Sequence, residues 1–197
     1  MTPGLLLQTL TNLAIVSPGA GLPAGWQLAH LRRAEAPVFG VTRAHTLSVE
    51  ATSAAGVASH RLAAPPLPRE GSGQLTWRWR TGTPLPQASI RVPSRDNSPA
   101  RVVVLFDDGR TLLYTWGNTE PVGDRSGGGP SGRRAIVVCR RADDANGSWY
   151  LEAHDPFSDY RRAFARAPHP IVSIGVGADT DLLGAHSVAE VSDVSWE

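Results

Sequence analysis

The stretch SWYLEAH, residues 148–154, places three side chains capable of acid–base chemistry at alternate positions of a predicted strand. Tyr150, Glu152 and His154 would share one face, because successive side chains of extended backbone point to opposite faces. A phenol, a carboxylate and an imidazole together are typical of proton transfer in a polysaccharide hydrolase or lyase. The same residue types also occur together by chance in ordinary strands, so this candidate catalytic set needs support from geometry.

Arginines of the stretch LTWRWR, residues 75–80, form a candidate binding site. Alternation places the leucine and both tryptophans of this stretch on the core side, so Arg78 and Arg80 face outward or into a groove. With Arg101 they would form a row of guanidinium groups suited to an anionic sugar or polymer, because guanidinium binds carboxylates and phosphates in paired fashion. The alternative is ion pairing with acidic residues of neighbouring strands, namely Glu152, Asp155 or Asp96.

Two aromatic residues extend this predicted ligand-binding surface. Tyr114 and Trp116 stand at the end of a predicted strand that runs into a loop. We expect them to face solvent, where aromatic rings can stack on sugars; burial in the core is the alternative.

Acidic residues near the C-terminus raise the question of a calcium site. From Asp179, the spacing to Asp181, Gly184 and Glu190 matches an EF-hand loop, but both flanks have the composition of strands, which excludes the EF-hand. Asp179 and Asp181 would still face one side of extended backbone, where their charges repel unless a cation or an arginine lies between them. The sequence therefore predicts either a structural Ca²⁺ at these two residues or their pairing with arginine and loop amides; no cofactor is required.

The single cysteine, Cys139, lies in the apolar run AIVVCR and cannot form an internal disulfide. We interpret it as a small buried hydrophobic residue rather than a catalytic thiol. The sequence contains no nucleophile-elbow GxSxG, no HExxH and no phosphate-binding loop that ends in GK[ST].

Apolar residues recur with a period of two almost throughout the chain, which predicts an all-β fold. We expect a single jelly-roll-type β-sandwich of about eleven strands, because many short apolar runs are separated by Gly, Pro, Asn and Asp turns. The stretch DPFSDYRRAFAR predicts one short helix near 155–166, with Asp155 as its cap and Asp159 paired with Arg162 on its exposed side. The glycine-rich segment 122–132 is predicted to be a flexible surface loop.

Composition limits the classes of partner. The 197 residues fit one domain, 1–197, and the 19 basic residues, all arginine, balance 18 acidic ones to a net charge of +1. No global field attracts nucleic acid, and the apolar stretch LLLQTLTNLAIV is too short to insert into a membrane and lacks the basic residues of an export signal. We expect a cytoplasmic location unless a signal peptide was removed; the oligomeric state is not indicated.

Several stretches together resemble the bacterial family DUF3047, a domain of unknown function, over nearly the whole chain. They are GLPAGW, the Ala-Ser of VASHRL, LTWRWR, RDNSPARVVVLF, LLYTWG, WYLEAHDPFSDYRRAFA and IGVGADTD. The resemblance implies a β-sandwich similar to galactose-binding-like and other carbohydrate-binding jelly rolls, without an established activity. The chain departs from the family pattern at His154, where Arg is usual, at Asn97 (Asp), at Ala165 (Gly), and at Leu182 and Leu183, where Asn-Thr is usual. The last change removes oxygen ligands beside Asp181.

These observations favour a noncatalytic binding module for a carbohydrate or a similar polar or anionic ligand. One alternative is a polysaccharide hydrolase or lyase that uses the acid–base set on the strand 148–154. The other is a structural module that interacts with a protein and binds no small ligand.

Overall fold

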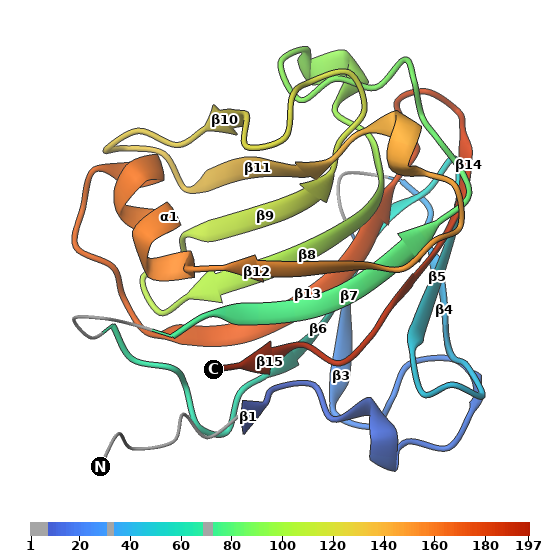
Figure 1. Ribbon diagram of the computed structural model, residues 1–197, viewed down its shortest axis with the longest axis horizontal. Helices are drawn as coiled ribbons and strands as arrows, with labels where there is room; N and C mark the ends of the chain where they lie inside the picture. Colours follow the sequence, from blue (N-terminus) through green and yellow to red (C-terminus); the bar gives the residue numbers. More distant parts are fainter. Residues whose placement is uncertain (1–7, 31–33, 69–72) are drawn as a thin grey trace.

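The computed structural model describes residues 8–30, 34–68 and 73–197, which form two β-sheets packed face to face and one α-helix (Figure 1). The predicted all-β sandwich is confirmed, and the two sheets share one apolar core. The single-domain organisation over 1–197 stays a prediction, since segments at 1–7, 31–33 and 69–72 lie outside the described residues. No helix in the described segments has the length and apolar composition needed to span a bilayer.

One sheet has eight strands, seven of them in the order β1-β15-β7-β14-β5-β4-β2, with β12 paired only to β7. The antiparallel register of β12 with β7 runs from Tyr150 opposite Trp79 to His154 opposite Leu75. The strands are β1 (Gln8–Thr9), β2 (Gly19–Ala20), β4 (Val38–Val41), β5 (Leu47–Thr52), β7 (Leu75–Thr81), β12 (Tyr150–His154), β14 (His186–Val191) and β15 (Ser195–Trp196).

The other sheet has seven strands in the order β10-β11-β9-β8-β13-β6-β3. Only the β9–β11 pair is parallel; the remaining neighbours are antiparallel. The strands are β3 (Trp26–His30), β6 (Ala55–Arg61), β8 (Ser98–Phe106), β9 (Thr111–Trp116), β10 (Arg125–Gly127), β11 (Arg134–Arg140) and β13 (Ile171–Asp179).

The structure corrects some predicted boundaries. The predicted strand QTLTNLAIV is only the two-residue β1 followed by a 3₁₀ turn, η1 (Leu13–Ile15). The predicted flexible loop 122–132 is wrong for residues 125–127, because β10 pairs there with β11. Two further 3₁₀ turns, η2 (Pro93–Arg95) and η3 (Ala142–Asp144), lie in connections.

The core follows from alternation in the strands. In β7, Leu75, Trp77 and Trp79 are buried, as predicted, while Arg78 is exposed between them. In β9, Leu112, Tyr114 and Trp116 point into the same core. The indole of Trp79 packs against the rings of Trp77 and Trp116, at centroid distances of 5.6 and 5.3 Å, so aromatic contacts join the two sheets.

The helix α1 (Pro156–Phe164) begins where sequence chemistry predicts. The Asp155 carboxylate accepts hydrogen bonds from the backbone N–H groups of Phe157 and Ser158, and Pro156 occupies the first turn. The predicted exposed pair of Asp159 and Arg162 is wrong, because Asp159 is buried and pairs with Arg125 instead. The helix lies at the left end of the sandwich in Figure 1, beside β11 and β12.

Candidate functional site

A cavity of about 270 Å³ lies where β11, β12 and α1 meet. Strand β12 hydrogen-bonds to β7 only, and its inward-pointing side chains face the opposite sheet: the ring centroids of His154 and of Tyr114 on β9 lie 4.4 Å apart. The cavity is lined by Val122, Gly123, Arg125, Val137, Val138, Cys139, Glu152, Ala153, His154, Asp155, Ser158, Asp159 and Arg162. Charged side chains from three elements therefore surround one small cavity.

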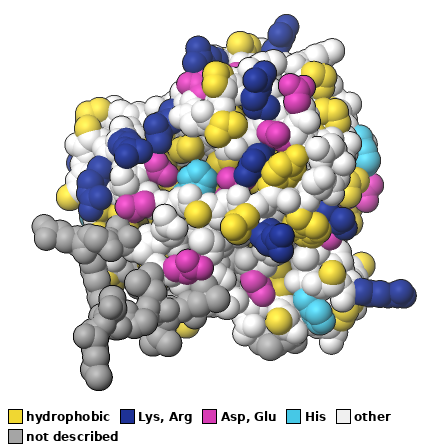
Figure 2. Space-filling model, viewed as in Figure 1, with side chains coloured by type: hydrophobic (Ala, Val, Ile, Leu, Met, Phe, Trp, Pro, Cys, Tyr) yellow, Lys and Arg dark blue, Asp and Glu magenta, His cyan; other side chains and the backbone are white. Residues whose placement is uncertain are grey.

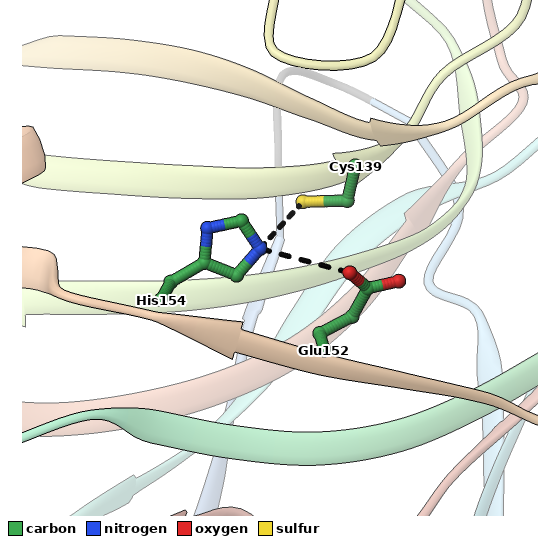
Figure 3. Close-up of side chains that lie close together, drawn as sticks. All are labelled: Cys139, Glu152 and His154. Carbon is green, nitrogen blue, oxygen red and sulfur yellow. Dashed lines mark hydrogen bonds and ion pairs between the residues drawn. The ribbon is translucent and has the colours of Figure 1, made fainter.

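Inward-pointing side chains at alternate positions of β11 and β12 form the floor of this cavity. In β12, Glu152 and His154 point inward while Leu151 and Ala153 are exposed. In β11, Cys139 points inward, and Figure 3 shows its sulfur directed toward the His154 imidazole, with the Glu152 carboxylate beside the same nitrogen. The distances from His154 Nε2 are 3.5 Å to Cys139 Sγ and 3.7 Å to Glu152 Oε2.

His154 is held as a cation in the folded chain. Burial alone would lower its pKa, but the Asp159 carboxylate, the Cys139 sulfur and the Glu152 carboxylate beside its ring nitrogens outweigh burial and raise the pKa from 6.5 to about 11. Its ring also stacks on Trp77, with centroids 5.4 Å apart. The side chain thus has a fixed orientation between the sheets.

Asp159 anchors the other side of the imidazole. Its Oδ2 lies 3.8 Å from His154 Nδ1 and accepts a 2.9 Å hydrogen bond from the Tyr114 hydroxyl, while Oδ1 accepts from Arg125 at 3.0 Å. Burial would raise the pKa of Asp159, but the neighbouring His154 imidazole and the hydrogen bond from Tyr114 lower it, so the carboxylate stays ionised. Burial raises the pKa of Cys139, which keeps this residue a neutral thiol.

The structure brings together only two members of the predicted acid–base set. Glu152 is buried, and its Oε1 accepts hydrogen bonds from Trp79 Nε1 at 2.9 Å and Arg140 Nε at 2.5 Å. Tyr150 does not line the cavity: its hydroxyl accepts from Asn146 Nδ2, and Arg140 stacks over its ring. The structure therefore places Tyr150 outside the cavity that holds Glu152 and His154, the other two members of the candidate set.

The predicted row of outward guanidinium groups is also incomplete. Arg101 is 1% exposed and pairs with Asp96 Oδ1 at 2.6 Å and with Asp179 Oδ2 at 3.3 Å. This residue cannot belong to an accessible row, and its pairing with Asp96 is the alternative weighed above. Arg78 is exposed; Arg80 pairs with Glu190 at 2.6 Å and lies over the Trp149 ring.

The prediction that Tyr114 and Trp116 face solvent is wrong. Both are 0% exposed, and both lie on the core face of β9. The Trp116 indole donates to the backbone oxygen of Arg141, and the Tyr114 hydroxyl to Asp159. Neither ring can contact a ligand from solvent in this conformation.

The aspartates of the predicted calcium site have arginine and amide partners. Asp179 is buried, pairs with Arg101, and accepts a 2.7 Å hydrogen bond from Asn97 Nδ2. The same amide lies 3.5 Å from Asp181 Oδ1. Pairing with arginine and amides thus accounts for Asp179, and calcium binding at Asp179 and Asp181 stays a prediction.

Of the residues that line the cavity, only Glu152 and His154 were predicted as site residues; the polar ones missed include Arg125, Cys139, Ser158, Asp159 and Arg162. Arg125 lies in the segment interpreted as a loop, Asp159 was expected on the solvent side of its helix, and Cys139 was assigned to the core without a partner. Helical spacing does carry a signal for Asp159, which stands three residues after the buried Pro156 and therefore lies on the same side of the helix. No local signal identifies Arg125.

A second hollow, of about 380 Å³, crosses the outer face of the seven-stranded sheet. Its lining is mostly small and apolar, with Arg133 and Arg134 at one end. Few polar groups converge there, which makes the cavity at His154 the stronger candidate for recognition of a polar ligand.

The raised pKa of His154 predicts a specific pH dependence of stability. The protonated His154 stabilises the folded state fully below pH 6.5, the pKa of an unperturbed histidine. This stabilisation is lost as the pH rises toward the folded-state pKa of about 11. Cys139, Glu152, Asp159 and Tyr114 are the titratable groups that face the ring. We expect the excess unfolding free energy of the wild type over His154→Gln to shrink between pH 6.5 and 8.5, by at most about 1.4 kcal/mol per pH unit.

Urea unfolding in metal-free buffer measures this difference. The control is His186→Gln, since His186 pairs with Glu50 on the surface, where both side chains are about half exposed. If the difference in unfolding free energy between the wild type and His154→Gln stays constant over this pH range, the imidazole is not held as a cation.

Comparison with known proteins gives a family and a set of distant folds. A family model described as "Protein of unknown function (DUF3047)" matches residues 24–195. No curated protein matches the chain.

Among solved structures, the chain resembles sandwich domains of proteins that act on or bind carbohydrates. A family 29 carbohydrate-binding module from Piromyces equi is 9% identical, with a TM-score of 0.42 and coverage of 97% of this chain and 89% of that chain. The xyloglucanase domain of a type three effector from Sinorhizobium fredii, in complex with cellobiose, is 9% identical, with a TM-score of 0.48 and coverage of 91% and 97%. A family 11 carbohydrate-binding module from Clostridium thermocellum is 10% identical, with a TM-score of 0.43 and coverage of 91% and 95%. At these identities and scores the likenesses carry no argument about ligand or activity.

Proposed function

The chain belongs to the DUF3047 family of proteins of unknown function, and we propose that it is a noncatalytic β-sandwich module that binds a carbohydrate with an anionic or strongly polar unit. The proposed site is the cavity between β11, β12 and α1. The observation that carries the proposal is the convergence of arginine, aspartate and serine side chains on one cavity of about 270 Å³.

The available hydrogen-bond donors at this cavity favour an anionic ligand. Asp155 caps the helix and Asp159 is bound by Tyr114 and Arg125, so the carboxylates already have partners within the protein. Arg162 is exposed, and the side chain of Arg125 is 37% exposed. Figure 2 shows basic side chains along the face over α1 and β10. Guanidinium groups in this position can bind the carboxylate or sulfate of a sugar in bidentate fashion.

The size of the cavity limits the part of the ligand that enters it. Pockets that enclose drug-sized molecules measure about 300–1,000 Å³. The smaller cavity here suits one sugar unit, with the rest of the chain lying on the surface outside. A terminal or side-branch uronic acid is the unit we favour.

The proposed role is noncatalytic because the acid–base groups are engaged. Glu152 Oε1 is bound by both Arg140 and Trp79, and the Tyr150 hydroxyl lies outside the cavity lining. A general acid or base must reach a substrate proton within hydrogen-bond distance. Polysaccharides incubated with the protein should therefore bind without release of new reducing ends or unsaturated products, and product release that disappears in Glu152→Gln would favour the hydrolase or lyase instead.

Calorimetric titration with a panel of uronate-containing, sulfated and neutral oligosaccharides tests the binding proposal. We expect binding of acidic members that weakens with added salt, and a loss of affinity of about tenfold or more in Arg162→Gln or Arg125→Gln, because each removes a charge-assisted hydrogen bond.

The matched controls are Arg78→Gln and Arg80→Gln on the outer face of the eight-stranded sheet. They should leave the affinity unchanged; a loss in these variants alone would move the ligand to that face. Failure of every oligosaccharide to bind at millimolar concentration would contradict the proposal and favour a protein partner.

A further inference from the structure

Three side chains on the floor of the cavity have the types and arrangement of a transition-metal site. Cys139 comes from β11, and Glu152 and His154 come from alternate positions of β12 (Figure 3). One ligand atom from each, Sγ, Oε2 and Nε2, can be chosen so that all lie within 4.8 Å of one another. We propose that Cys139, Glu152 and His154 bind a zinc ion. The inference goes beyond the proposed carbohydrate binding and does not depend on it.

The two distances from His154 Nε2 are close to those of a tetrahedral zinc ion, and all three ligand atoms lie within 4.8 Å of one another. Zinc bonds of about 2.3 Å to sulfur and about 2.0–2.1 Å to nitrogen place these two atoms about 3.5 Å apart. The separation of Cys139 Sγ and His154 Nε2 is 3.5 Å. Glu152 Oε2 lies 3.7 Å from the same nitrogen, and a small rotation of the carboxylate brings it to about 3.3 Å, the value for zinc.

Contacts to the other polar atoms of His154 and Glu152 leave Nε2 and Oε2 near each other. Asp159 Oδ2 faces His154 Nδ1 and thereby directs Nε2 toward the sulfur. Trp79 and Arg140 bind Glu152 Oε1 and leave Oε2 on the side of the imidazole. A carboxylate behind a histidine ligand and donors behind a carboxylate ligand are regular features of protein metal sites.

The combination of ligands selects the metal. A thiolate and an imidazole favour zinc over the hard cations magnesium and calcium, which take oxygen ligands. Binding displaces one proton from the thiol and one from the imidazolium, so a dication replaces two protons and the net charge of the site does not change. Three protein ligands leave the fourth zinc position open to water or a ligand in the cavity.

Cobalt(II) binding to the full chain, prepared without a histidine tag, tests the proposal. Cobalt at a tetrahedral site with a thiolate gives a near-ultraviolet sulfur-to-metal band and intense visible bands, and zinc should displace it. The sequence contains one cysteine, so the sulfur-to-metal band can come only from Cys139 and should vanish in Cys139→Ala. His154→Gln and Glu152→Gln should weaken zinc binding by about 100-fold or more, and Asp159→Asn, at a positioning residue, by about 10–100-fold.

The control variant His186→Gln removes a surface imidazole next to Glu50 and should leave the cobalt spectrum and the zinc affinity unchanged. Near-ultraviolet circular dichroism establishes that each variant is folded. X-ray absorption of the zinc-loaded wild type needs no substitution and should show one sulfur ligand.

Two outcomes would overturn the proposal: a folded wild type without the sulfur-to-metal band at a hundredfold excess of cobalt, or a zinc ligand shell of only oxygen and nitrogen. Either would mean that the three side chains hold one another by hydrogen bonds alone. Oligosaccharide titration in the presence of a chelator tests the proposed carbohydrate binding without metal. A protein that binds oligosaccharide but no zinc would contradict the zinc site alone.

Discussion

Replacement of Arg101 by methionine is expected to lower the free energy of unfolding by about 3–5 kcal/mol. The guanidinium is 1% exposed and lies between two buried carboxylates, 2.6 Å from Asp96 and 3.3 Å from Asp179. Methionine fills a similar volume but leaves Asp179 without the guanidinium that pairs with it. A buried carboxylate that loses its cation is costly, because neither water nor the apolar core replaces that interaction.

The cost should depend on the lost ion pair with Asp179 rather than on lost packing. Asp179→Asn in the Arg101→Met background removes the carboxylate charge, so the double variant should be less destabilised than the sum of the two single variants. Asp96 keeps its second partner, Arg134, in all of these variants. Urea unfolding of the four proteins gives the coupling energy between Arg101 and Asp179.

Arg91→Met provides the matched control for an arginine paired at the surface. Arg91 is 65% exposed and pairs with Asp124, and exposed pairs of this kind contribute about 0–1 kcal/mol. If Arg101→Met were no more destabilising than Arg91→Met, the buried network would not be the stabilising element described here.

The position of Arg101 shows what the alternation of side chains predicts correctly and what it cannot predict. In β8, Val102 and Val104 point into the core, and Arg101 points to the opposite face of the sheet, as its place in the alternation predicts. That face is not open here, because the connection from β7 to β8 contributes Ile90 to a small apolar cluster on it and Asp96 to the ion pair. A period of two identifies the face of a strand but not the loop that covers it.

The two aromatic residues of β9 were predictable from the same rule. Leu112, Tyr114 and Trp116 alternate with Leu113, so a core assignment for Leu112 places both rings in the core as well. Their position near a loop, from which solvent exposure was predicted, was a weaker signal than this alternation.

The candidate site could be predicted only in part. Alternation in β12 puts Glu152 and His154 on one face, and alternation in β11 puts Cys139 on the inner face of the other sheet. That the two faces meet depends on β12 pairing with β7, a contact between segments about 75 residues apart in sequence. Local patterns contain no information on such pairings, so the cavity emerges only from the assembled sandwich.

Replacement of Trp79 by alanine is the other change with a large expected effect, a loss of about 3–5 kcal/mol in the free energy of unfolding. The indole is fully buried against Trp77 and Trp116, and its Nε1 donates the 2.9 Å hydrogen bond to Glu152. Truncation leaves a cavity where the two sheets meet, since the surrounding rings belong to different strands and can relax only in part.

Trp79→Phe separates packing from the hydrogen bond. This variant retains most of the ring but removes the donor, and it should cost about 1–3 kcal/mol because one oxygen of a buried carboxylate loses a partner. Trp149→Ala is the matched control: Trp149 is partly exposed beneath the Arg80 guanidinium, and its truncation should cost far less than that of Trp79. Equal losses of unfolding free energy at Trp79 and Trp149, measured by urea unfolding, would contradict the inward orientation of the β7 indoles. The outward position of Arg78 and the orientation of Glu152 in the cavity both depend on that orientation.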